Sequence, residues 1–60
     1  MEIVRRFIVL WRDGTLMAVV EIEARDERAA VWESSSYMPP GAWAVAGVRE
    51  VETATQPGGN

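Results

Sequence analysis

Serine hydroxyls and glutamate carboxylates are the candidate reactive groups of this chain, which contains no histidine and no cysteine. A serine nucleophile needs an adjacent base, so the run from Ser34 to Ser36 is expected to cap or solvate a helix end instead. Glu21 and Glu23 fall on one strand face and could pair as acid and base. Arg6 is expected opposite Glu21, however, and a cross-strand ion pair is the simpler interpretation. No catalytic residue is predicted.

Ligands for metals and cofactors are also sparse. Without histidine and cysteine the chain lacks the commonest nitrogen and sulfur ligands of protein metal sites. The turn Pro39-Pro40-Gly41 precedes an apolar segment and has no lysine, so it does not match a phosphate-binding loop. We therefore expect no metal site, no cofactor and no enzymatic activity.

Two apolar runs, residues 3–12 and 15–24, are joined by Asp13-Gly14 and predict a β-hairpin. Asp-Gly between two such runs is typical of a two-residue type I′ turn. That turn places Leu10 opposite Met17 and Ile8 opposite Val19.

Both faces of this hairpin carry apolar side chains, because successive residues of a strand point to opposite sides. One face is interrupted only by Arg5 and otherwise holds Ile3, Phe7, Val9, Trp11, Leu16, Ala18, Val20 and Ile22. The other has a central patch of Ile8, Leu10, Met17 and Val19, with Val4, Arg6, Glu21 and Glu23 toward one end. A 60-residue chain can cover only one of these faces. The uncovered face is the predicted binding surface.

The segment after the hairpin predicts a helix that begins after Asp26, which is a good N-cap residue. Pro39-Pro40-Gly41 stops it, so the helix is expected to end near Tyr37. The small residues Ala30 and Ser34 would allow close approach to a sheet. The face that they share with Tyr37 is therefore favoured as the packed one.

A third strand is predicted from Trp43 to Val51, and its alternation breaks at Ala46-Gly47, where a glycine indicates either a bulge or a close backbone contact. A right-handed crossover between the second and third strands leaves room for the first between them. The predicted fold is a two-layer α+β domain of β-β-α-β order, with an antiparallel sheet in the order 2-1-3 and the helix on one face. Residues 1–52 form the domain, and residues 53–60 are expected to be a disordered C-terminal tail.

The net charge of −3 comes from nine acidic residues against six arginines. Mild acidity argues against direct binding to a phosphate backbone, so a nucleic-acid binder built on Arg5, Arg6, Arg12 and Trp11 is not expected.

No segment approaches the roughly 20 apolar residues of a membrane span, and the first residues do not resemble a signal peptide. We expect no membrane contact and a cytoplasmic location.

The remaining binding candidates are aromatic and acidic. Tryptophan is enriched in binding hot spots; Trp11 or Trp43 is expected in the core, and Trp32 is expected to be half exposed. Acidic residues of the helix and the third strand would matter if folding gathers them onto one surface. Alternatively, a second copy of the chain covers the apolar patch, which would make the protein a homodimer.

The second half of the chain resembles the small RNA-polymerase inhibitor of lytic podoviral coliphages. The matching residues are Ala24 with Asp26-Glu27 and Ala30, then Tyr37-Met38-Pro39-Pro40-Gly41, and then Trp43 to Arg49. The resemblance implies a hairpin, a helix, a Tyr-x-Pro-x-Gly turn and a last strand whose two arginines engage the polymerase. Arg49 matches the second arginine, whereas Gly47 stands at the position of the first. For that reason an anti-CRISPR protein is preferred within the same class of small phage inhibitors.

The sequence thus predicts a non-enzymatic, protein-binding inhibitor of phage or mobile-element type that blocks a bacterial nucleic-acid-handling complex. Its target is expected to be a CRISPR effector, with RNA polymerase as an alternative, and a small homodimeric interaction module as a second alternative. The predicted partner-binding residues are Ile8, Leu10, Met17, Val19, Glu27, Trp32, Glu33, Arg49 and Glu50.

Overall fold

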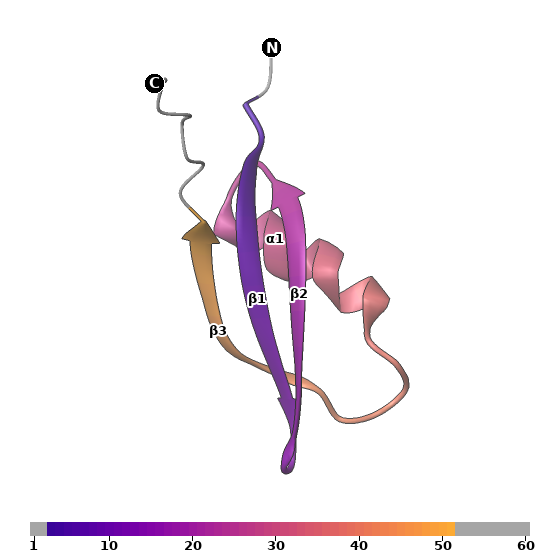
Figure 1. The fold of residues 1–60 in the computed structure, drawn as a ribbon. Coiled ribbons are helices and arrows are strands. Elements are labelled where there is room, and N and C mark those ends of the chain that lie inside the picture. Colours follow the sequence, from indigo (N-terminus) through magenta and orange to yellow (C-terminus); the bar gives the residue numbers. More distant parts are fainter. Residues whose placement is uncertain (1–2, 52–60) are drawn as a thin grey trace.

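The computed structural model describes residues 3–51 of the chain, so the predicted tail lies outside the described residues. The elements are β1 (Arg5–Asp13), β2 (Leu16–Ala24), α1 (Glu27–Ser34), the 3-10 turn η1 (Ser35–Tyr37) and β3 (Ala44–Val51). The three strands form one antiparallel sheet in the order β2-β1-β3. The helix α1 lies behind one face of this sheet (Figure 1). The predicted fold class and strand order are confirmed.

The hairpin turn differs from the predicted one. Asp13 pairs with Leu16, so the two-residue loop is Gly14-Thr15, and only Gly14 has a positive φ, of 63°. A positive φ at the first loop position alone is the type II′ requirement, not that of type I′. Asp13 belongs to the strand, where its carboxylate accepts a hydrogen bond from the backbone N–H of Ala42 at 3.2 Å.

The predicted register is therefore wrong by two residues: Leu10 lies opposite Val19, and Ile8 lies opposite Glu21. Side chains alternate with a period of two along a strand, so a shift of two leaves every side chain on its predicted face. The division of the hairpin into two apolar faces is unaffected by the error.

Helix α1 begins as predicted. Asp26 has an extended backbone, and its carboxylate accepts a hydrogen bond from the Ala29 N–H at 2.8 Å. Ala30 and Ser34 are fully buried, which confirms the predicted packing face. Tyr37, in contrast, is 68% exposed. The helical segment extends past β2 at this end (Figure 1), so no strand lies beneath η1.

The core joins β1 to the helix. Phe7, Val9 and Trp11 of β1 are buried, together with Ala30 of α1. The Trp11 Nε1–H donates to the Ser34 hydroxyl at 3.1 Å, and that hydroxyl donates to the Val31 carbonyl at 3.0 Å. Both buried polar groups are satisfied, which is what burial of a tryptophan and a serine requires. Trp11 is thus a core residue, and Trp43 is half-buried against the same core.

Strand β3 contains a bulge where the alternation breaks, which decides between the two alternatives that the glycine left open. Leu10 pairs with Gly47 and Trp11 pairs with Val45, which leaves Ala46 as the extra residue. Beyond the bulge Arg49 lies opposite Ile8. The bulge therefore sets which residues of β3 face the helix and which face away from it.

We predict that Ser34→Ala lowers the free energy of unfolding by about 1–3 kcal/mol, because it leaves the buried Trp11 N–H without an acceptor. Ser36→Ala is the matched control, since the exposed Ser36 hydroxyl donates to the carbonyl three residues earlier in the same way. The control should change stability by less than about 0.5 kcal/mol. Denaturant unfolding followed by Trp fluorescence measures both, and equal losses would contradict the account.

A second pair of variants tests the loop before β3. Gly41 has a φ of 155°, and a Cβ there would lie 2.7 Å from Asp13 Oδ2 and 2.9 Å from Trp43 Nε1. Gly41→Ala should therefore destabilise the protein by about 1–3 kcal/mol. A Cβ at Gly47 meets nothing within 4 Å, and Gly47→Ala should raise stability by roughly 0.5 kcal/mol. The melting temperatures of the two variants should thus move in opposite directions.

Candidate functional site

The face of the sheet that α1 does not cover is the candidate site, and we call it the open face. Cross-strand pairing places on it every second residue of β1 and β2 and, around the bulge, four residues of β3. No element formed by residues 3–51 packs over it (Figure 1). Its members are Arg6, Ile8, Leu10, Arg12, Met17, Val19, Glu21, Glu23, Ala44, Gly47, Arg49 and Val51.

The centre of the open face is apolar. Its patch consists of Ile8, Leu10, Met17 and Val19, the set that the hairpin pattern predicts. Met17 is 55% exposed and Val19 is 63% exposed, whereas Ile8 and Leu10 on the central strand are half-buried by their neighbours. Large apolar side chains exposed side by side are typical of a contact surface.

A shallow hollow lies beside the patch, between β1 and β3. It forms where Gly47, opposite Leu10, offers no side chain to the open face. Its lining residues are Ile8, Leu10, Gly47, Val48 and Arg49.

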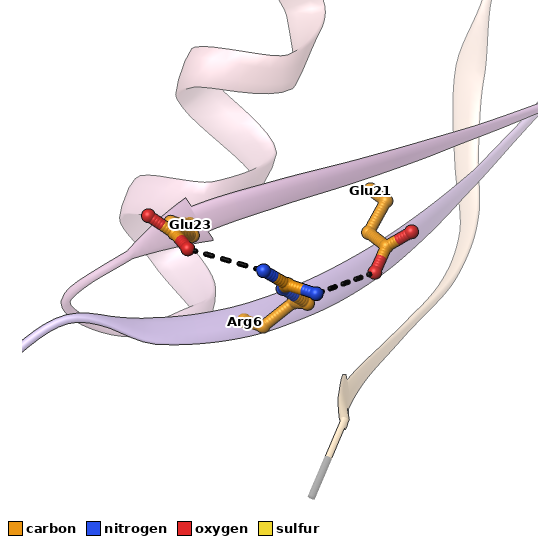
Figure 2. A network of polar contacts seen from close by, with 3 residues as sticks. All are labelled: Arg6, Glu21 and Glu23. Atoms are coloured by element: carbon orange, nitrogen blue, oxygen red, sulfur yellow. Dashed lines mark hydrogen bonds and ion pairs between the residues drawn. The ribbon is translucent and has the colours of Figure 1, made fainter. Parts of the chain in front are cut away.

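Charged residues surround the patch. Arg6 donates to Glu21 at 3.5 Å and to Glu23 at 3.3 Å, so one guanidinium spans both carboxylates (Figure 2). The predicted ion pair of Arg6 with Glu21 is confirmed, although Glu23 is the residue directly opposite. All three side chains are about half exposed, so these pairs contribute little to stability. Arg12 and Arg49 form no ion pair with any residue of the described range.

The predicted partner-binding residues fall on two sides of the molecule. The apolar patch and Arg49 share the open face. Glu50 lies opposite Phe7, on the helix side of the sheet, where its carboxylate is 3.6 Å from the Arg5 guanidinium.

The other predicted contacts lie on α1. Glu27 is in its first turn, and Glu33 and Trp32 are near its end. Trp32 is 78% exposed, more than the half exposure expected from the sequence. Because α1 lies behind the sheet, these residues and the open face cannot contact one flat surface together.

Seven open-face residues are absent from the predicted partner-binding set: Arg6, Arg12, Glu21, Glu23, Ala44, Gly47 and Val51. Arg12 could have been found, because it shares the alternation of Leu10 along β1. Gly47 could not, since its place opposite Leu10 depends on long-range pairing with β3.

The arginine set of the alternative nucleic-acid hypothesis is divided. Trp11 is buried and cannot stack on a base. Arg5 lies on the helix side, over the Phe7 ring at 5.5 Å, and donates to the Arg25 carbonyl at 3.1 Å. Arg6 is held by two glutamates.

The three serine hydroxyls considered above form hydrogen bonds within the helix end. The hydroxyls of Ser34, Ser35 and Ser36 each donate to the carbonyl three residues earlier, as expected for a capped helix end. Within residues 3–51 no group of three or more carboxylates is placed to hold a metal ion. Helix α1 is too short to cross a bilayer, and residues 3–51 contain no helix that is long and apolar enough to do so.

No family model, curated protein or solved structure matches this chain.

Burial of only one face of the sheet predicts different stability losses for substitutions at Val9 and Val19, which lie on opposite faces of the same hairpin. Val9→Thr introduces a hydroxyl at a position with no exposed surface and should cost about 1–3 kcal/mol. Val19→Thr makes the same change on the open face and should alter stability by less than about 0.5 kcal/mol. Urea unfolding of the two variants measures the difference; comparable losses would show that the open face is covered.

Proposed function

We propose that this chain is a non-enzymatic inhibitor of the phage or mobile-element type, and that its open face contacts a bacterial nucleic-acid-handling complex in the host cytoplasm. The observation that carries this proposal is the exposed patch of Ile8, Leu10, Met17 and Val19 on a face without a covering layer in the described range. Complete burial of a fully exposed side chain of this size contributes roughly 1.5–3 kcal/mol, and these partly exposed side chains would contribute a fraction of that each against a partner.

The charge of the open face supports a protein partner. Arg6, Arg12 and Arg49 outnumber Glu21 and Glu23 on it, although the whole chain has a net charge of −3. A partner surface with an apolar centre and flanking carboxylates is complementary to this arrangement.

Contact through the open face is better supported than nucleic-acid mimicry by an acidic surface. Of the acidic residues that the mimicry hypothesis uses, Glu50 is paired with Arg5 and lies on the helix side of the sheet. Glu27 and Glu33 lie on α1, where Arg28 separates them along the helix. The proposed inhibitor therefore occludes its target by wedging its open face against a protein surface.

A CRISPR effector is the proposed target, because Gly47 replaces one of the two arginines expected of a polymerase inhibitor. RNA polymerase is the second candidate. The position of Arg49 favours it: this arginine lies on the open face, opposite Ile8 at the edge of the patch.

We predict that Leu10→Glu abolishes inhibition, because it places a carboxylate in the centre of the apolar patch. Ser36→Glu introduces the same charge at an exposed position of η1 and should inhibit like the wild type. The readouts are transformation of bacteria by a plasmid that their CRISPR system targets, and transcription by purified bacterial RNA polymerase. Circular dichroism confirms that both variants are folded.

The two readouts separate the candidate targets. Recovery of transformation with unaffected transcription identifies a CRISPR effector, whereas loss of transcription identifies the polymerase. Equal activity of Leu10→Glu and the wild type would overturn the assignment of the open face. A wild-type protein without effect in either assay would overturn the proposed function.

A further inference from the structure

We infer that two copies of this chain pair in antiparallel orientation along the free edge of β2. The two sheets would then join into one sheet with the strand order β3-β1-β2-β2-β1-β3. This inference concerns the edge of the sheet and does not rest on the proposed function.

The first half of strand β2, residues 16–20, is an unprotected edge. The strand pairs with β1 over nine consecutive residues without a bulge, it contains no proline and no lysine, and its two charged residues, Glu21 and Glu23, lie in its second half. Bulges, prolines and charged side chains are the usual means by which proteins prevent edge-to-edge pairing. The opposite edge, β3, is interrupted by the bulge at Ala46. Of the two edges, β2 is thus the one on which a further strand can form a regular ladder.

The hairpin turn determines which backbone groups point outward. Asp13 and Leu16 close the two-residue loop and form a hydrogen-bonded pair, so alternate residues of β2 from Leu16 onward bond to β1. The residues between them direct their N–H and C=O groups away from β1. These are Met17, Val19, Glu21 and Glu23.

Exposed apolar side chains are concentrated on the same strand. Leu16, Met17 and Val19 each expose more than half of their surface. Met17 and Val19 belong to the open face, but Leu16 lies on the helix side of the sheet, close to the turn. Exposure on both faces is explained by a neighbour at the edge, which would cover part of each face.

The charges of β2 select the antiparallel orientation. Glu21 and Glu23 both lie in the second half of the strand. Parallel pairing in register would set each carboxylate beside its copy, which is destabilising. Antiparallel pairing centred on Val19 instead sets Glu21 opposite Met17 of the second copy and Leu16 opposite Ile22.

The helix provides a further contact. A two-fold axis perpendicular to the joined sheet places both helices on the same side of it. In Figure 1 the end of α1 and η1 extend past β2, on the side away from β1. In the proposed dimer the second copy would lie on that side. The exposed Trp32 and Tyr37 belong to this part of the chain.

Substitutions of Met17 by residues of opposite charge test this arrangement, because more than half of this side chain is exposed. Met17→Glu would face Glu21 of the second copy and should raise the dimer dissociation constant about fivefold. Met17→Lys would pair with that carboxylate and should lower the constant about fivefold. Sedimentation equilibrium of the full chain from micromolar to millimolar concentration measures the constants.

Leu10→Glu distinguishes the edge from the open face. Leu10 lies on the central strand, so this variant should dimerise like the wild type even where it abolishes inhibition. Three outcomes would overturn the inference: a monomeric wild type at every concentration, weakening by both Met17 variants, or loss of the dimer in Leu10→Glu. The last two would indicate that the copies pack through their open faces.

Discussion

The docking of α1 against Trp11 is the constraint on which the rest of the structure depends. The helix approaches β1 closely because Ala30 and Ser34 are small, and the Ser34 hydroxyl satisfies the indole N–H beneath it. A hydrophobic contact and a buried hydrogen bond thus fix one helix on one face of the sheet. Since α1 is the single α-helix in the described range, the opposite face keeps its apolar residues exposed.

Exposure of apolar side chains on the open face is unfavourable for a small domain, which has few such side chains to bury. Few residues of the described range are fully buried, and a domain of this size buries only about 60% of its unfolded surface. Replacing Met17 and Val19 by polar residues would improve solubility without loss of core packing. Their exposure on the open face and on the β2 edge is the observation from which contacts with other molecules are proposed.

Much of the fold could be predicted from the sequence because local patterns specify it. Strand alternation assigns each hairpin residue to a face, and this assignment survives an error of two in the register. The Asp26 cap, the helical stretch to Tyr37 and the bulge at Ala46-Gly47 each have a local signal. The exact register has no local signal, because Asp13-Gly14 and Gly14-Thr15 both fit a two-residue turn. The contact between Asp13 and Ala42 is long-range and cannot be read from a local pattern.

The candidate site was predictable to the same extent. Its apolar patch lies within one hairpin, so alternation alone identifies it. The positions of Arg49 and Glu50 on opposite sides of the sheet depend on how β3 pairs with β1 beyond the bulge. The exposure of Tyr37 depends on the extent of the helical segment relative to the sheet, which no local pattern specifies.

The most direct measurement of one-sided burial is the NMR relaxation that a soluble gadolinium chelate causes at side-chain methyl groups of the dilute protein. The structure predicts strong relaxation at Met17 and Val19 and almost none at Val9 and Ala30. Protection of Val19 equal to that of Val9 would contradict the account, because it would mean that the open face is covered in the free protein.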